Sequence, residues 1–162
     1  MDTVHGEVAE ACARFGGSVV RDASPEPFDL VLDLTGADDS EAFTFERAEN
    51  RTTVTATGQR GLLHGLFHVV RLGEDAFGGQ RARLTHRPGV ALRVLDHWDN
   101  VAVHPVMGQV ERGYSGGSLF WRDGRARGDL ERVRVYGRLL AACGINAVTV
   151  NNVMCTRPRH GC

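Results

Sequence analysis

Two clusters of polar and aromatic side chains follow predicted β-strands in the second half of the chain, and together they could bind a sugar. The run from Asp96 to Asn100 ends one predicted strand, the pair Asn151–Asn152 ends another, and the loop 111–117 lies between them. Amides and carboxylates bond sugar hydroxyls, an aromatic ring covers the face of a sugar, and an arginine holds an anionic substituent. The candidate substrate-binding residues are Trp98, Asp99, Asn100, Glu111, Arg112, Asn151 and Asn152.

Each candidate also has a purely structural interpretation, which the spacing alone favours. Asp99 and Asn100 are typical residues for capping a loop. Trp98 is a large aromatic residue of the kind usually found in a core. Glu111 and Arg112 are adjacent and could pair with each other. A binding role therefore needs support beyond spacing.

The elements that would position these residues lie in the second half of the chain. An apolar run predicts a strand at 90–95, periodicity predicts a helix at 129–143 that ends before Gly144, and a second strand is predicted at 145–150. This order is typical of a βαβ unit with parallel, buried strands. Because parallel strands end at the same edge of a sheet, the unit would bring the candidates together.

The first half predicts a separate α/β domain. Apolar residues three and four positions apart indicate helices, and alternation indicates strands, the last two of them forming a β-hairpin. The predicted helices are 4–15 and 59–72, and the predicted strands are 18–20, 28–34, 42–47 and 51–57.

The stretch 73–89 is rich in glycine, arginine and charged residues and indicates a linker. We therefore expect a domain boundary near residue 85, with domains at 1–85 and 86–162. The predicted fold class is α/β throughout.

Metal binding is not indicated. His64 and His68 stand four residues apart on a predicted helix, as a zinc pair would, but no third ligand is evident and a polar helix face is favoured. The four cysteines form no CxxC pair, which excludes a zinc ribbon or a thioredoxin-type motif. We expect no metal and no organic cofactor.

Composition excludes several classes of protein. Of the 162 residues, 42% are hydrophobic and 24% are charged, which argues against disorder. A net charge of −1 gives no footprint for nucleic acid, and no apolar run is long enough to span a membrane. The polar start carries no secretory signal, so we expect a cytoplasmic location, or an extracellular one if the true amino terminus lies upstream.

Four short motifs in order resemble glycoside hydrolase family 67, the α-glucuronidases of xylan breakdown. In this chain they read HWDN, ERGYSG, GIN and NNV, and they occupy residues 97–100, 111–116, 144–146 and 151–153. A further stretch, GLLHGLFH at 61–68, resembles the helix after a hairpin in that family's N-terminal domain, which hexosaminidase-type hydrolases share.

The resemblance implies an activity and a fold. Family members release glucuronic acid or its 4-O-methyl ether from substituted xylooligosaccharides with inversion. The implied architecture is a hexosaminidase domain 2-like α/β domain followed by the first βαβ of a truncated (β/α)8 barrel. A homodimer is compatible with the family, and the residues do not decide it.

Three departures accompany the resemblance. Asp96 stands where the family usually has Asn, the loop 101–110 is longer than usual, and residues 154–162 read like out-of-frame translation or a truncated gene model. In the family the catalytic carboxylates come from later barrel strands. We therefore assign no catalytic residue and expect an N-terminal fragment that is inactive by itself. The alternative is a stand-alone, non-catalytic carbohydrate-binding or interaction module.

Overall fold

A computed structural model of the chain describes residues 2–15, 18–19, 30–48, 51–98, 119–122 and 125–151. The chain divides into two units, residues 1–91 and residues 92–162, and each is described by itself. Both units contain helices and strands, which confirms the predicted α/β class. No helix within the described ranges is long and apolar enough to cross a membrane.

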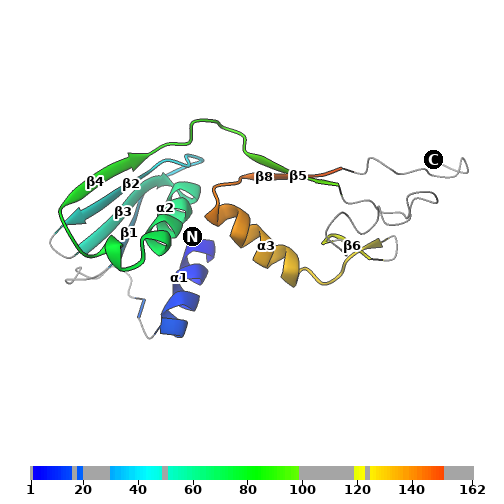
Figure 1. The fold of residues 1–162 in the computed structure, drawn as a ribbon, viewed down its shortest axis with the longest axis horizontal. Coiled ribbons are helices and arrows are strands. Elements are labelled where there is room, and N and C mark those ends of the chain that lie inside the picture. Colours follow the sequence, from blue (N-terminus) through cyan, green and yellow to red (C-terminus); the bar gives the residue numbers. More distant parts are fainter. Residues whose placement is uncertain are drawn as a thin grey trace, which may run out of the picture. The chain divides into compact units, whose positions relative to one another are not determined.

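Unit 1 is built on a four-stranded sheet (Figure 1). Its elements are α1 (Asp2–Phe15), β1 (Leu30–Asp38), β2 (Phe43–Ala48), β3 (Arg51–Gly58), α2 (Gln59–Leu72), the 3-10 helix η1 (Gly73–Ala76) and β4 (Ala82–His86). The strand order is β1-β3-β2-β4. Strand β1 is parallel to β3, and β2 is antiparallel to both β3 and β4.

The core of unit 1 lies between α2 and one face of the sheet. Alternate residues of β2 and β3 face the helix, so Phe45 and Val54 are only 2% and 0% exposed. On α2, the buried residues Leu62, Leu66 and Val69 follow the spacing of one helical face. Every second residue of the strands and every third or fourth residue of the helix therefore lie on the two faces that meet. These residues form a single apolar layer.

Two glycines allow α2 to approach the sheet closely. A Cβ atom on Gly61 would lie 2.2 Å from the carbonyl oxygen of Ala42, and one on Gly65 would lie 2.2 Å from Cγ1 of Val54. The backbone N–H of Gly61 also donates to the carbonyl of Ser40 at 3.1 Å. The GLLHGLFH stretch thus places its glycines where a side chain would push the helix away.

Most predicted elements of unit 1 are confirmed. Helices 4–15 and 59–72 correspond to α1 and α2, and the predicted hairpin is the antiparallel pair β2–β3. The strand predicted at 28–34 is β1, which extends to Asp38. The strand predicted at 18–20 is wrong in its described part, because residues 18 and 19 are not in a strand.

The linker predicted at 73–89 is also wrong. This stretch contains η1 and the edge strand β4, which pairs with β2, so the expected boundary near 85 falls inside a strand. Charged and polar side chains on the outer face of β4 gave it the composition of a linker, and such residues are typical of edge strands. The guanidinium of Arg47 holds the connecting loop by donating to the carbonyls of Gln80, at 2.9 and 2.7 Å, and of Asp75.

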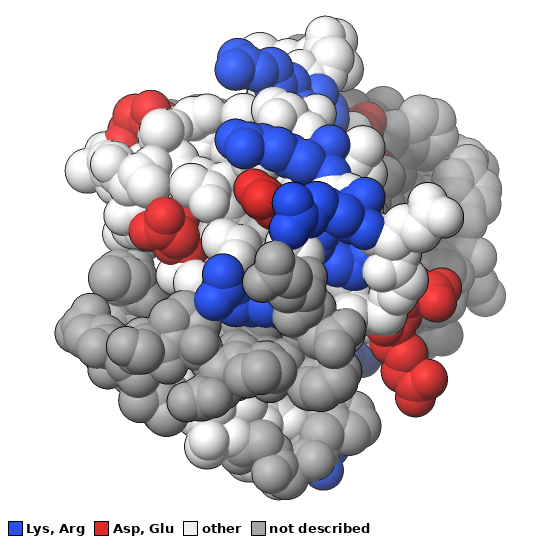
Figure 2. Space-filling view, turned by 90° about the vertical axis from the view of Figure 1, so that its left-hand side faces the viewer, with Lys and Arg blue, Asp and Glu red and all other residues white. Residues whose placement is uncertain are grey.

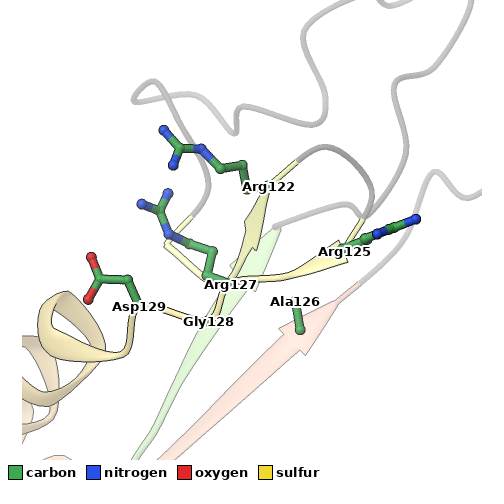
Figure 3. A pocket seen from close by; sticks show the side chains of 6 residues that line it. All are labelled: Arg122, Arg125, Ala126, Arg127, Gly128 and Asp129. Carbon is green, nitrogen blue, oxygen red and sulfur yellow. The ribbon is translucent and has the colours of Figure 1, made fainter.

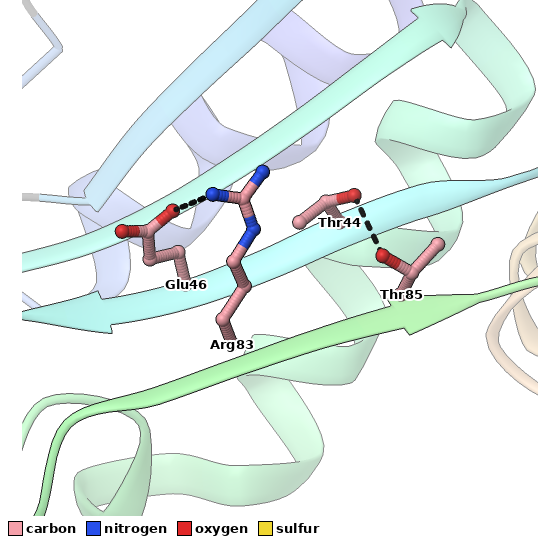
Figure 4. A network of polar contacts seen from close by, with 4 residues as sticks. All are labelled: Thr44, Glu46, Arg83 and Thr85. Atoms are coloured by element: carbon pink, nitrogen blue, oxygen red, sulfur yellow. Dashed lines mark hydrogen bonds and ion pairs between the residues drawn. The ribbon is translucent and has the colours of Figure 1, made fainter.

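Polar cross-strand pairs cover the face of the sheet opposite α2. The hydroxyls of Thr44 and Thr85 are 3.2 Å apart, and Glu46 pairs with Arg83 at 3.6 Å (Figure 4). Figure 2 shows the side of the molecule on the left of Figure 1, where arginine side chains gather in a band with separate carboxylates around it. Exposed pairs of this kind stabilise weakly, so they keep the face polar rather than hold the fold.

Unit 2 contains a parallel strand pair and a helix. Its elements are β5 (Val94–Trp98), β6 (Trp121–Arg122), β7 (Arg125–Ala126), α3 (Glu131–Ala142) and β8 (Ala147–Asn151). Strands β5 and β8 pair in parallel with α3 between them in sequence, which confirms the predicted strand–helix–strand order. The first strand begins at Val94 rather than at residue 90, and it takes in Asp96, His97 and Trp98.

The expectation that these strands are buried is wrong for the residues described. Leu95 and Val150 are each 40% exposed, and Val148 is 37% exposed. Helix α3 has no fully buried residue either. In the described part of unit 2 this sheet has only two strands, and their apolar side chains stay partly exposed.

Two histidines, His68 and His86, pack against the phenylalanine rings in the core of unit 1. The ring of His68 on α2 lies 4.5 Å from that of His86 on β4, and 5.3 Å from that of Phe45. The Nε2 atoms of both histidines are buried without a hydrogen-bond partner. Burial, then the nearby His86 and Arg71, lower the pKa of His68 below its ordinary value of 6.5.

The first prediction concerns the close approach of α2. Gly61→Ala should destabilise unit 1 by about 1–3 kcal/mol, because the new methyl group would collide with a backbone carbonyl that cannot move freely. Urea unfolding followed by circular dichroism measures the change. The matched control is Gly6→Ala in α1, where nothing lies within 4 Å of the added Cβ and stability should stay the same or rise. Equal stability of Gly61→Ala and the unaltered chain would contradict the packing described.

The second prediction concerns pH. Because the folded state lowers the pKa of His68, the unfolded chain binds its proton more readily, and unit 1 should lose stability as pH falls below about 6.5. His68→Gln should flatten this part of the curve of unfolding free energy against pH. His5→Gln, at an exposed position on α1, should leave the slope unchanged. A slope unaffected by His68→Gln would show that other groups set the pH dependence.

Candidate substrate-binding edge

The carboxyl ends of β5 and β8 form one edge of the parallel pair. In the register of the two strands, Val94 lies opposite Ala147 and Trp98 lies opposite Asn151. This confirms that the two strands carrying the predicted polar clusters are parallel and end together. The other candidates, Asp99, Asn100, Glu111, Arg112 and Asn152, lie outside the described residues. The binding roles of all seven stay predictions.

A set of hydrogen bonds at the opposite ends of the strands fixes this register. The backbone N–H of Arg93 donates to Oδ1 of Asn146 at 2.8 Å. The backbone N–H groups of Asn146 and Ala147 donate back to the carbonyl of Arg93, at 3.1 and 3.3 Å. The guanidinium Nε of Arg93 also donates to the carbonyl of Gly144 at 2.5 Å. The residue before β5 is therefore tied to the turn that leads into β8.

That turn is set by the end of α3. Gly144 has a φ of +76°, as its predicted place after the helix requires. Its N–H donates to the carbonyl of Ala141 at 3.0 Å, and the N–H of Ile145 donates to that of Leu140 at 2.9 Å. This pair of bonds is a Schellman motif, which satisfies the last carbonyls of the helix and turns the chain toward β8.

Asp96 holds the middle of the strand pair. Its carboxylate accepts a hydrogen bond from the hydroxyl of Thr149, the residue opposite it in β8. An asparagine, which the family usually has at this position, could accept the same bond through its side-chain oxygen. The sequence analysis did not single out Thr149, and only the register shows that it faces Asp96.

The side chain of His97 lies on the other face of β5 and contacts α3. Its Nε2 and the hydroxyl of Tyr136 on α3 share a hydrogen bond. Its ring lies 5.2 Å from that of Tyr136 and 5.4 Å from that of Phe120, both edge-on. Burial raises the pKa of Tyr136, so this hydroxyl stays protonated. His97 thus joins the strand to the helix rather than projecting with Asp96.

A pocket lies in the connection between β5 and α3. The short strands β6 and β7 pair as a hairpin in which Arg122 is opposite Arg125. The pocket is about 480 Å³ and is lined by Arg122, Arg125, Ala126, Arg127, Gly128 and Asp129 (Figure 3). The sequence analysis missed it, although three arginines within six residues were a visible signal.

Within the described residues, no group of three or more His, Cys, Asp or Glu side chains is placed to hold a metal ion. The His64 and His68 pair on α2 therefore has no third ligand among these residues. His68 instead stacks in the aromatic core of unit 1.

Comparison with known proteins places this edge in a family. Residues 76–158, which run from η1 through β8, match the model of the glycosyl hydrolase family 67 middle domain. The chain belongs to glycoside hydrolase family 67. This confirms the resemblance drawn from the four motifs, and it makes the chain a member of a hydrolase family.

Relatives that match this chain include proteins named as α-glucuronidases. Alpha-glucuronidase A of Emericella nidulans is 41% identical over 101 residues, which are 62% of this chain and 12% of that protein. Alpha-glucuronidase of Hypocrea jecorina is 38% identical over 102 residues, again 62% of this chain and 12% of that protein. Alpha-glucuronidase A of Aspergillus tubingensis is 33% identical over 116 residues, 71% of this chain and 13% of that protein. The chain thus spans 12–13% of the length of these relatives.

The third prediction tests the bonds that set the register. Asn146→Ala removes the acceptor for the N–H of Arg93, at a cost of about 1 kcal/mol. The amides of β8 and of Arg93 should therefore exchange with deuterium about fivefold faster. Asn146→Asp keeps an acceptor oxygen and should exchange nearly as the unaltered chain does. Unchanged exchange in Asn146→Ala would mean that the side chain does not hold the strands in register.

Proposed function

We propose that this chain supplies part of an α-glucuronidase that releases glucuronic acid or its 4-O-methyl ether from xylooligosaccharides with inversion. The observation that carries the proposal is the family 67 match over residues 76–158. The relatives that share this segment are named as α-glucuronidases. The parallel end of β5 and β8, with Trp98 opposite Asn151, is where an α/β enzyme would bind substrate.

We propose that the two units correspond to two domains of such an enzyme. Unit 1, with helices and a mixed sheet, would be the hexosaminidase domain 2-like domain that precedes the catalytic domain. Unit 2 would be the start of a (β/α)8 barrel, because β5, α3 and β8 form one parallel strand–helix–strand step.

In this proposal the chain contributes substrate contacts rather than proton transfer. Inversion needs two carboxyl groups on opposite sides of the scissile bond, one acting as acid and one as base. In the described part of unit 2, each carboxylate has a structural partner. Asp96 accepts from Thr149, Asp129 accepts from the backbone of Glu131 at 3.0 Å, and Glu131 lies 3.7 Å from Arg134. We assign none of these as the acid or the base.

The fourth prediction tests the proposal in a chimera. Residues 76–153 of this chain would replace the matching segment of the Emericella nidulans alpha-glucuronidase A, and release of 4-O-methylglucuronic acid from aldouronic oligosaccharides would be measured. The chimera should be active, whereas the 162-residue chain alone should release nothing. Asn151→Ala in the chimera should lower kcat/KM by about tenfold, because a polar contact to the sugar is lost.

The control for this assay is Arg134→Gln in the same chimera. Arg134 lies in an exposed ion pair on α3 with a side chain 76% exposed, so its loss should leave kcat/KM unchanged. A folded chimera without activity would contradict the proposed function. Full activity of Asn151→Ala would contradict the proposed contact between Asn151 and the sugar. Release of 4-O-methylglucuronic acid by the 162-residue chain alone would contradict the expectation that it is inactive by itself. Tight xylooligosaccharide binding with an inactive chimera would favour a non-catalytic binding module.

A further inference from the structure

The side chain of His97 is the point at which β5 meets two other parts of unit 2. Its Nε2 shares a hydrogen bond with the hydroxyl of Tyr136 on α3. Its ring also lies edge-on to that of Phe120, with the two centroids 5.4 Å apart. The carbonyl of Phe120 in turn accepts the backbone N–H of Arg127 at 2.9 Å, just outside the β6–β7 hairpin. One imidazole therefore joins the strand, the helix and the connection between them.

Apolar packing between α3 and the strand pair is weak in the described part of unit 2. Leu95, on the same face of β5 as His97, is 40% exposed, and so is Val150, which lies opposite His97 in β8. Helix α3 has no fully buried residue. Apolar contact stabilises in proportion to the area removed from water. The hydrogen bond and ring contacts of His97 therefore matter more for holding this end of β5 against the helix.

The two faces of β5 are held by different partners just before the strand ends. Asp96 accepts a hydrogen bond from Thr149 of β8, and the next residue, His97, bonds Tyr136 of α3. Because successive residues of a strand point to opposite faces, the two bonds act on opposite sides and oppose rotation of the strand about its axis. Trp98 follows directly as the last residue of β5. The path of the backbone at Trp98 is therefore set by the two residues before it.

We propose that His97 is a positioning residue, which through its bond to Tyr136 fixes the carboxyl end of β5 and so sets the position of Trp98. In this inference His97 touches neither the substrate nor the reacting atoms. The role of Trp98 as a substrate contact rests on the proposed function. The effect of the bond on the end of β5 rests on the contacts of His97 alone.

The fifth prediction uses Trp98 as a reporter of its own position. The chain contains two tryptophans, so Trp121→Phe leaves Trp98 as the single one. In this background Tyr136→Phe removes the hydroxyl and keeps the ring, and acrylamide should quench the fluorescence of Trp98 about twofold more strongly. His97→Leu should have at least this effect, whereas His97→Gln, whose amide can still bond the hydroxyl, should restore most of the protection. The control Thr44→Val also loses one hydroxyl bond, in unit 1, and should not change the quenching.

A second readout is the split between KM and kcat in the chimera with the Emericella nidulans alpha-glucuronidase A. Tyr136→Phe should raise KM for aldouronic oligosaccharides about fivefold and change kcat by less than about twofold, because a sugar contact is displaced and no proton-transfer group is lost. A general loss of stability would instead lower the active fraction, and with it kcat, at unchanged KM. In a Trp98→Leu chimera, Tyr136→Phe should raise KM no further, because residues that act through one another are not additive.

Unchanged quenching of Trp98 in both Tyr136→Phe and His97→Leu would overturn the proposal. A fall in kcat at unchanged KM, or a full additional effect of Tyr136→Phe in the Trp98→Leu chimera, would also overturn it. The quenching readout does not depend on hydrolysis. An inactive chimera together with increased quenching in Tyr136→Phe would therefore remove the proposed function and support the placement of β5 by His97. An active chimera whose KM does not respond to Tyr136→Phe would remove this inference alone.

Discussion

The position of β8 against β5 depends on the hydrogen bonds between Arg93 and the turn after α3. Both backbone groups of Arg93 and its guanidinium are used in this junction. A slip of one residue would turn every side chain of β8 to the other face of the pair. Asp96 would then lose Thr149 as its partner, and Trp98 would no longer stand opposite Asn151. The hydrogen bonds at the amino ends of β5 and β8 therefore determine which residues lie side by side at their carboxyl ends.

The two units reach their stability in different ways. Unit 1 buries a continuous core, in which residues such as Val54 and Phe45 are nearly inaccessible, and its helix lies directly on the sheet because glycine occupies the contact points. In the described part of unit 2, the apolar side chains of the strands and α3 are partly exposed. Hydrogen bonds between residues of this unit therefore contribute more to holding its elements in place. A substitution in the Arg93 junction should therefore destabilise the whole β5–β8 pair. A substitution of an outward-facing side chain in unit 1 should affect only its immediate surroundings.

The sequence predicted the elements whose patterns are repeated over many residues. Helix α2 was predicted with its observed bounds, because its apolar residues keep one helical face from Leu62 to Val69. Strand β4 was missed, because an edge strand with one charged face has the composition of a linker. The four motifs identified the family, but they could not show that Asp96 bonds Thr149 or that His97 turns toward Tyr136. Those contacts depend on register and on which face of a strand a residue occupies, and the register is fixed by residues far apart in sequence.

The distribution of charge in unit 2 bears on the division of labour within the proposed enzyme. Its described carboxylates are each held by a hydroxyl, a backbone N–H or an arginine. The arginines of the β6–β7 hairpin, Arg122 and Arg125, line a pocket together with Arg127 and Asp129, and Figure 3 shows Arg125 pointing to the opposite side from Arg122. Cleaving the glycosidic bond with inversion needs one carboxyl group that donates a proton and another that accepts one. In the proposed enzyme, this segment is therefore given substrate contacts, and no acid or base is assigned among its described carboxylates.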